Sequence, residues 1–468
     1  MISLTLGHVV SLVATLVVIV SITVYSARAV TSAEGFSLCG RSSGAMLIAG
    51  GISGTCVGGA ATIGTAQMAF SIGLSAWWFT AGVGLALIFL AVFYAYPLRK
   101  SGLETLPQYL NIHYGRKAGP LASIISSLGI LFSAVASSLS GISLIALIFG
   151  LASWQAAAVI IILVTACVLF GGLKGAGVSG LLKMAVIWTT LFAAGLLACL
   201  SLSHMPDFDA VFPAFPWFSL AGRGMPDCLG NLASLIVGTI CTQTYIQAIY
   251  SASNSKVAAI GTLTAAVITI PVGLPSVAVG MFMHAMHPDI EPILALPMYL
   301  ALYLPSWLGG IGLAGILFSI VGSIAGLALG IGTMVSNDIG RGILRIADGR
   351  RILLINRGTV LLVTCLAMAI ALANAGTYVL DWNYMSMALR GAGVFVPMTL
   401  AIFWPRRLSA AWAVLSMMAS TAFAVFGRFG LGLSVNPLFT GLSVSLLIIS
   451  LGLMIPLARQ RRAERSGQ

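Results

Sequence analysis

Charged residues are scarce in this chain of 468 residues. Asp, Glu, Lys and Arg together make up 7% of it, whereas a soluble domain carries about a quarter. Hydrophobic residues make up 59%, and the mean hydropathy is +1.06. This composition excludes an ordinary water-soluble globular protein.

The sequence contains long apolar runs with few charged residues. A helix needs about 20 mostly apolar residues to cross a bilayer. The sequence holds about thirteen such runs, at about 7–30, 44–69, 72–96, 119–150, 154–173, 180–203, 229–251, 257–286, 306–335, 354–374, 378–402, 408–427 and 436–458. Lipid offers the backbone no hydrogen-bond partner, and barrel strands are half as long and alternate in polarity, so the runs should be helices. We predict an all-α polytopic membrane protein with about 13 transmembrane helices and no soluble domain.

The net charge of +12 does not indicate nucleic-acid binding, because of where the charge lies. If the N-terminus is outside, 20 of the 23 Lys and Arg fall in cytoplasmic segments, Lys183 among them. Arg223 and Arg428 fall outside, and Arg390 falls within a span. Such an excess of Lys and Arg is typical of cytoplasmic loops. We therefore predict a multi-pass protein of the cytoplasmic (inner) membrane, with its N-terminus outside and its C-terminus inside.

Metal-binding and disulfide patterns are also missing. The seven Cys are spread through apolar runs without a C-x-x-C pair, and none of the five His is spaced with an acid as metal ligands are. We expect no cofactor, no disulfide framework and no metal beyond a coupling cation. The first apolar run lacks the basic start and cleavage site of a signal peptide, so it should be a retained helix.

Glycine, in contrast, is abundant, with 53 residues. Most glycines suit close packing of helices. The run IAGGISGTCVGGAATIG at 48–64 is so dense in glycine that a continuous helix would lose about 1 kcal/mol at each one. We predict a broken helix there and, from a similar density, in the span 306–335. Unwound backbone can coordinate Na⁺ in transporters; glycine packing in continuous helices is the alternative.

Two connecting segments have a distinct character. Residues 97–118 are predicted to form a short helix at the cytoplasmic membrane surface, with an apolar face of Leu103, Leu106, Tyr109 and Leu110. Residues 204–228 are rich in Pro and aromatic residues and suit an external loop. A lid over a transport pathway and an inert loop are both open for this second segment.

Six segments between about residues 36 and 410 are informative when they are taken together and in order. They are FSLCGRSSG at 36–44, GGAATIGTAQMAFSIGLSAWWF at 58–79, SGLETLPQYLNIHYG at 101–115, TYIQAIYSASNSKVA at 244–258, VSNDIGR at 335–341 and LRGAGVFVPM at 389–398. In content and order they resemble the sodium:solute symporter family.

This resemblance implies a leucine-transporter-like fold with two inverted five-helix repeats. The implied parts are an accessory N-terminal helix in 1–35, the first repeat in 36–203, the external loop in 204–228, the second repeat in 229–402, and two accessory helices with a basic cytoplasmic tail in 403–468.

The resemblance also implies a Na⁺ site. Gly54 and Val57 would contribute backbone oxygens, with Ser319 and Ser323 opposite, since hard cations favour oxygen ligands. The sequence departs from the family at Gly322, where many Na⁺-coupled members have Ser or Thr. Ser319, one turn before Ser323, is a substitute for that hydroxyl.

Arg390 is the one charged residue that we place deep in a span, where Arg costs roughly 2.5–3.5 kcal/mol. Two roles are open: binding a carboxylate or gating, and capping carbonyls of a neighbouring unwound helix. Gln67, Thr242 and Gln243 join Arg390 as candidate substrate-binding residues, with packing between helices as the alternative for each. Because the spans offer Gln and Thr but no acids, the solute should be neutral or anionic.

The resemblance implies a secondary active transporter, not an enzyme, that couples symport of a small organic solute to a cation, Na⁺, by alternating access. The expected partners are the solute and the lipid bilayer; no oligomeric state is predicted. One alternative is a proton-coupled transporter of the same fold, which Gly322 favours and the lack of intramembrane acids opposes. Another is a transporter-like membrane sensor. A channel is disfavoured because no filter sequence is repeated.

Overall fold

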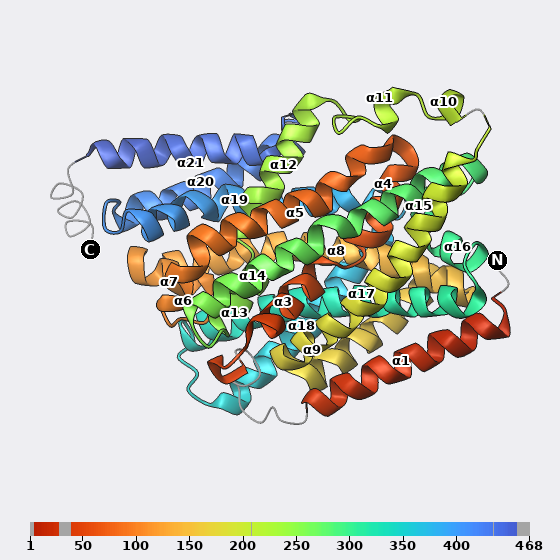
Figure 1. The fold of residues 1–468 in the computed structure, drawn as a ribbon. Coiled ribbons are helices and arrows are strands. Elements are labelled where there is room, and N and C mark those ends of the chain that lie inside the picture. Colours follow the sequence, from red (N-terminus) through yellow and green to blue (C-terminus); the bar gives the residue numbers. More distant parts are fainter. Residues whose placement is uncertain (1–3, 28–38, 207, 434, 456–468) are drawn as a thin grey trace.

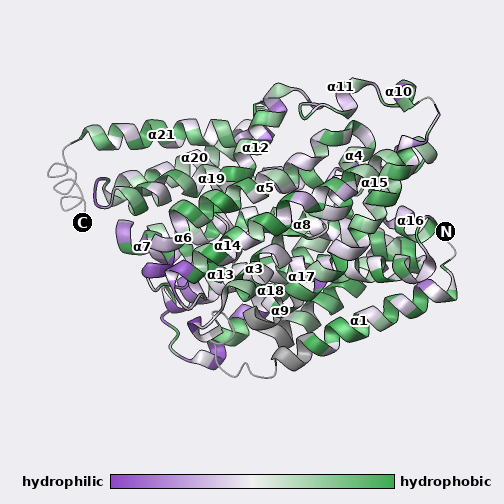
Figure 2. Ribbon diagram, viewed as in Figure 1, coloured by the Kyte–Doolittle hydropathy of each residue, from purple (hydrophilic) through white to green (hydrophobic). Residues whose placement is uncertain are grey.

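Helices dominate the computed structural model, which describes residues 4–27, 39–206, 208–433 and 435–455 (Figure 1). Within these ranges the only β-pairing is an isolated bridge between Ser43 and Ala252. Ten described helices are long and apolar enough to cross a membrane, and apolar residues extend along most of their length (Figure 2). The predicted all-α polytopic membrane fold is confirmed, whereas the count of thirteen spans stays a prediction.

The helices of the bundle are α1 (Leu6–Ala27), α3 (Ala45–Cys56), α4 (Thr65–Ile72), α5 (Trp78–Phe89), α6 (Ala95–Lys100), α8 (Ala118–Phe149), α9 (Ser153–Ser203), α12 (Met225–Ile240), α13 (Gln243–Tyr250), α14 (Ser255–Thr269), α15 (Gly273–Met286), α16 (Ala295–Leu302), α17 (Ser306–Met334), α18 (Gly349–Ala373), α19 (Val379–Phe403), α20 (Ala410–Phe429) and α21 (Pro437–Met454). In Figure 1, α1 begins at the end of the bundle where α16 lies, and α21 runs toward the opposite end.

The first predicted broken helix is confirmed. α3 ends at Cys56, and Val57 leaves the helical conformation with φ −86° and ψ 78°. The chain is helical again in the π-helical turn η2 (Ala60–Gly64), which leads into α4. Glycine is required at the break because a Cβ at Gly58 would collide with the Ser323 side chain. The break thus brings bare backbone against α17.

A second break, which the sequence analysis did not predict, divides the span 229–251. α12 ends at Ile240, and α13 begins only at Gln243. Thr242, between them, is extended with φ −84° and ψ 113°. No glycine or proline lies at this point, so the local sequence gives no signal for it.

The predicted break in the span 306–335 is wrong. α17 runs without interruption from Ser306 to Met334 and continues as a π-helical segment, η7 (Val335–Arg341). Its glycines serve close packing instead: a Cβ at Gly315 would lie 2.6 Å from Val186, and one at Gly326 would lie 2.7 Å from Thr55. The alternative reading of these glycines holds here.

The predicted spans 154–173 and 180–203 lie in one helical stretch, α9. In a straight helix Ile160 and Lys183 would be about 35 Å apart. Yet Ile160 and Ile320 both border Gly141, and Lys183 contacts Ser319, the residue before Ile320. Ile160 and Lys183 therefore pack at the same level of α17, and α9 does not run straight between them.

Glycine contacts bring the second part of α9 against α3. Added Cβ atoms at Gly50 and Gly180 would collide with the backbone of the opposite helix. α17 packs against α1, α3, α8 and α9, while α20 and α21 pack against each other and against α19. The broken helix α3 is thus held between α9, α14 and α17 near the centre of the bundle.

The two connecting segments also have structure. The predicted short helix forms as α7 (Leu106–Tyr114), which buries Leu106, Tyr109 and Leu110, while its place at the cytoplasmic membrane surface stays a prediction. Figure 2 shows hydrophilic residues gathered at this end of the bundle. The loop after α9 forms α10 (Phe208–Val211) and α11 (Ala214–Trp217) at the other end.

Candidate cation and substrate site

The break after α3 faces two serines of α17. The Ser319 hydroxyl donates to the main-chain oxygen of Val57 at 2.5 Å, and the Ser323 hydroxyl donates to that of Thr55 at 2.6 Å. Both serines are buried. Three of the four predicted cation ligands therefore lie at one contact, while Gly54 packs against Gly180 of α9.

Lys183 lies at the same contact. Its Nζ donates to the main-chain oxygen of Ser319 at 3.1 Å, and the residue is only 1% exposed. The expectation that Lys183 belongs to a cytoplasmic segment is wrong, because its α9 face packs against α3 and α17 rather than facing water. Arg390 is accordingly not the only charged residue deep in the bundle.

A free Na⁺ does not fit this arrangement beside Lys183. The carbonyl oxygens of Val57 and Thr55 already accept hydrogen bonds from serine hydroxyls. The ammonium group of Lys183 donates to the carbonyl oxygen of Ser319. Two unit charges 4 Å apart repel each other by about 4 kcal/mol at an effective dielectric constant of about 20. The oxygens suit a hard cation, but a cation of the chain itself already lies there.

Arg390 is fully buried in α19 and hydrogen-bonded through all three of its nitrogens. Nη1 donates to Thr242 Oγ1 at 2.9 Å, Nη2 donates to Ser133 Oγ at 3.1 Å and Ser386 Oγ at 2.8 Å, and Nε donates to the Ser386 main-chain oxygen at 3.2 Å. Arg390 thus fastens α19 to α8 and to the break between α12 and α13.

The two predicted glutamines lie apart from this cluster. The Gln243 side chain accepts from Leu106 N at 2.8 Å and donates to the Glu104 oxygen at 3.3 Å, so it holds α7. Gln67 accepts from Val379 N at 2.9 Å and donates to the Thr377 oxygen at 3.2 Å, at the start of α19. Of the four predicted substrate-binding residues, the structure brings together only Thr242 and Arg390.

Sequence reasoning missed three members of these clusters. Lys183 lies inside the apolar run 180–203, and its place there was the available signal. Ser133 and Ser386, which bind Arg390, are ordinary serines within spans, where a hydroxyl more often bonds its own helix. Only the packing of α8 against α19 distinguishes them.

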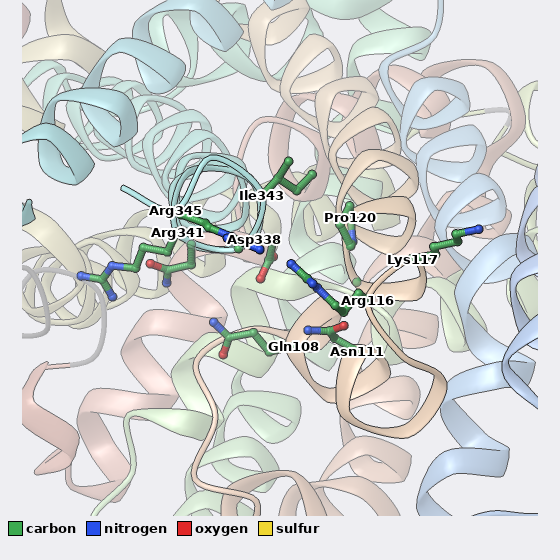
Figure 3. Close-up of a pocket in the computed structure, with 12 residues that line it drawn as sticks. Gln108, Asn111, Arg116, Lys117, Pro120, Asp338, Arg341, Ile343 and Arg345 are labelled. Atoms are coloured by element: carbon green, nitrogen blue, oxygen red, sulfur yellow. The ribbon is translucent and has the colours of Figure 1, made fainter. Parts of the chain in front are cut away.

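A polar cavity of about 740 Å³ opens at the end of the bundle where α7 lies. Gln108, Asn111 and Arg116 face Asp338 across it (Figure 3). Asp338 accepts from the Thr105 hydroxyl at 2.9 Å, which ties η7 to the start of α7. The cavity gives water access to the segment that follows α17.

The segment 204–228 covers the opposite end of the bundle. Trp217 packs against Gly73, and Trp78 Nε1 donates to the Leu220 oxygen at 2.8 Å. Arg223 forms an ion pair with Asp381 at 2.6 Å. Burial lowers the pKa of Arg223, but the hydrogen bond and charge of Asp381 outweigh this effect, so that its pKa is raised.

Known proteins resemble this chain in sequence. The high affinity choline transporter 1 of Mus musculus is 27% identical over 384 residues, which are 76% of this chain and 65% of the mouse protein. That of Rattus norvegicus is 27% identical over 405 residues, 81% of this chain and 68% of the rat protein. The chain thus spans about two thirds of the length of these relatives.

Solved structures resemble it in fold. A Na⁺-coupled sialic acid symporter matches 96% of this chain and 97% of its own, with a TM-score of 0.80 and 17% identity. A transporter of the nucleobase-cation-symport-1 family covers 90% and 95%, with a TM-score of 0.56 and 12% identity. These neighbours share the leucine-transporter-like fold. The model of the sodium:solute symporter family matches residues 36–420, most of the chain, and the chain therefore belongs to that family.

Proposed function

We propose that this protein is a secondary active transporter that couples the symport of a small organic solute to a cation, by alternating access and without covalent chemistry. Family membership supports Na⁺ as the driving ion. The relatives named as transporters support a carrier rather than an enzyme.

One observation carries this proposal: two interrupted helices lie in the bundle, each fastened at its break to another helix. The first break is held to α17 by Ser319, and the second is held to α19 through Thr242 and Arg390. Transporters build their binding sites at such interruptions, because half-helix ends and free carbonyls can meet solute and ion there.

The positions of the breaks support two inverted repeats, 36–203 and 229–402. Each break lies in the first helix of its proposed repeat, α3 with α4 and α12 with α13. We place the protein in the cytoplasmic membrane with its N-terminus outside. Cysteine substitutions at Arg428 and Arg407 test this orientation: an impermeant thiol reagent added to intact cells should label position 428 and not position 407.

We propose a neutral or anionic solute. Lys183 and Arg390 place two cationic side chains in the bundle interior, whereas Asp338 is the one buried acid in the described part of the chain. Choline, which gives the relatives their name, is a cation and is therefore the informative comparison. Substrate roles for Gln67, Thr242, Gln243 and Arg390 remain part of this proposal.

A proton-coupled carrier of the same fold is the second candidate. Two observations favour it: Gly322 leaves the cation site without an expected hydroxyl, and Lys183 lies where Na⁺ was expected. A transporter-like sensor, by contrast, would bind solute without moving it.

The test combines binding and uptake. Thermal unfolding of the purified full chain is measured with choline, neutral solutes and carboxylates, each in NaCl, KCl and at acid pH. Compounds that raise the unfolding midpoint are then tested for uptake into proteoliposomes under a Na⁺ or a pH gradient. Na⁺-driven uptake supports the proposal, uptake driven by pH alone supports the second candidate, and binding without uptake overturns both in favour of the sensor.

A further inference from the structure

Lys183 is a buried cation whose local setting resembles that of a bound metal ion more than that of a salt bridge. Its ammonium group donates to a main-chain oxygen, that of Ser319. No salt bridge joins Lys183 to an acid anywhere in the described chain.

The end of α3 offers further attraction. The C-terminal end of a helix carries a partial negative charge, which favours a cation nearby. Gly180, one turn before Lys183, packs against Gly50 and Gly54 of α3. This packing carries Lys183 to the level at which α3 ends.

Gly322 makes room for the ammonium group. A Cβ at Gly322 would lie 3.5 Å from Lys183 Nζ and 4.0 Å from its Cδ. These are ordinary contact distances, so a Ser or Thr hydroxyl that points toward the lysine would crowd the ammonium group. Gly322 of α17, which lacks the expected hydroxyl, and Lys183 of α9 therefore belong to the same contact.

We propose that the Lys183 ammonium group is a tethered cation that permanently fills the site between the break in α3 and α17, in place of a free Na⁺. It links α9 to α17 through the main-chain oxygen of Ser319, beside the end of α3. The inference rests on the proposed function, since it concerns the cation of a carrier, and it adds that a driving Na⁺ binds to other oxygens than those of Val57 and Ser319.

The test is a gain of Na⁺ binding. Unfolding midpoints of the purified full chain are measured from 0 to 300 mM NaCl, with KCl keeping the ionic strength constant. Lys183→Ala should gain a Na⁺-specific rise of about 4 °C, the size expected when the ion exceeds its dissociation constant many-fold. The rise should vanish in Lys183→Ala/Ser323→Ala. Lys256→Ala, which removes an exposed lysine, is the control and should behave like the wild type.

Two outcomes overturn the proposal. One is a folded Lys183→Ala protein without a Ser323-dependent rise. The other is a rise in the wild type that Ser323→Ala abolishes, because Na⁺ would then bind here with Lys183 in place. If Lys183→Ala does not fold, Lys183→Met keeps the apolar stem, and the wild-type comparison remains decisive. The Na⁺ titration needs no solute, so its failure is distinct from a failure to find uptake.

Discussion

Arg390 Nη1 lies 2.9 Å from the hydroxyl of Thr242, at the point where α12 stops and α13 has not yet begun. A buried guanidinium group thus stabilises an extended residue in the middle of a membrane span. The contact joins the second interrupted helix to α19, and through Ser133 to α8. It gives Arg390 a fastening role between helices, to which the proposed role in solute binding would be added.

Replacing Arg390 should therefore destabilise the protein before it alters selectivity. Arg390→Ala removes the hydrogen bonds of the guanidinium group to Thr242, Ser133 and Ser386, and a hydrogen bond to a charged group contributes about 1.5–3 kcal/mol to stability. Arg390→Lys keeps the charge but loses the planar fork of the guanidinium group. Its stability should therefore lie between that of the wild type and that of Arg390→Ala. Thermal unfolding measures this order, with exposed Arg428→Ala as the control within about 0.5 kcal/mol of the wild type. Unchanged uptake by Arg390→Lys, per folded protein, would exclude a bidentate solute contact.

Gly58→Ala should separate the first break from α17. The added methyl group meets the Ser323 side chain, whereas the one added by Gly51→Ala, in the same segment, lies 3.8 Å from Ala248 in ordinary contact. We expect Gly58→Ala to lower the free energy of unfolding by about 1–3 kcal/mol through overpacking. Gly51→Ala should be neutral or slightly stabilising. Equal unfolding midpoints for the two variants would contradict the close approach of the break to α17.

Thr105 joins η7 to α7 with one hydroxyl. That oxygen donates to Asp338 and accepts from Gln108 N at 3.2 Å, so it caps α7. Thr105→Val should lower the free energy of unfolding by about 1–2 kcal/mol. Thr105→Ser keeps the hydroxyl and should retain most of the wild-type stability. Hydrogen exchange across residues 106–114 is the direct measurement, because only the loss of the cap speeds exchange there. Equal exchange rates in Thr105→Val and Thr105→Ser would contradict the capping role of the Thr105 hydroxyl.

The ion pair between Arg223 and Asp381 should hold the segment that follows α9 without dependence on pH. A raised pKa contributes stability that is lost only as the pH rises through the folded-state value. For Arg223 that pKa is raised above the already strongly basic value of an ordinary arginine. The contribution should therefore be constant from pH 7 to pH 10. Since both side chains are partly exposed, Asp381→Asn should cost less than about 1 kcal/mol and increase proteolysis within residues 214–224. A loss of protection in the wild type at pH 9 would contradict this.

The two polar clusters show where sequence reasoning succeeds and where it stops. The break after Cys56 was predictable because glycine density is a local property with a known cost in a helix. The break at Cys241 and Thr242 was not predictable, because it is stabilised by Arg390 of another helix, which lies 148 residues after Thr242 in the sequence. Similar glycine density in α17 led to a wrong prediction, since those glycines meet neighbouring helices whose positions the sequence does not reveal.

The sequence by itself determined the membrane setting, the helical class and the family, because long apolar runs, the distribution of Lys and Arg and ordered motifs are properties of the chain read in one dimension. Only the tertiary structure decided which charges lie inside. Lys183 looks from the sequence like a residue at the cytoplasmic start of a span. Its burial against Ser319 depends on α9 packing against α3 and α17, and a contact of that kind exists only after the helices have come together.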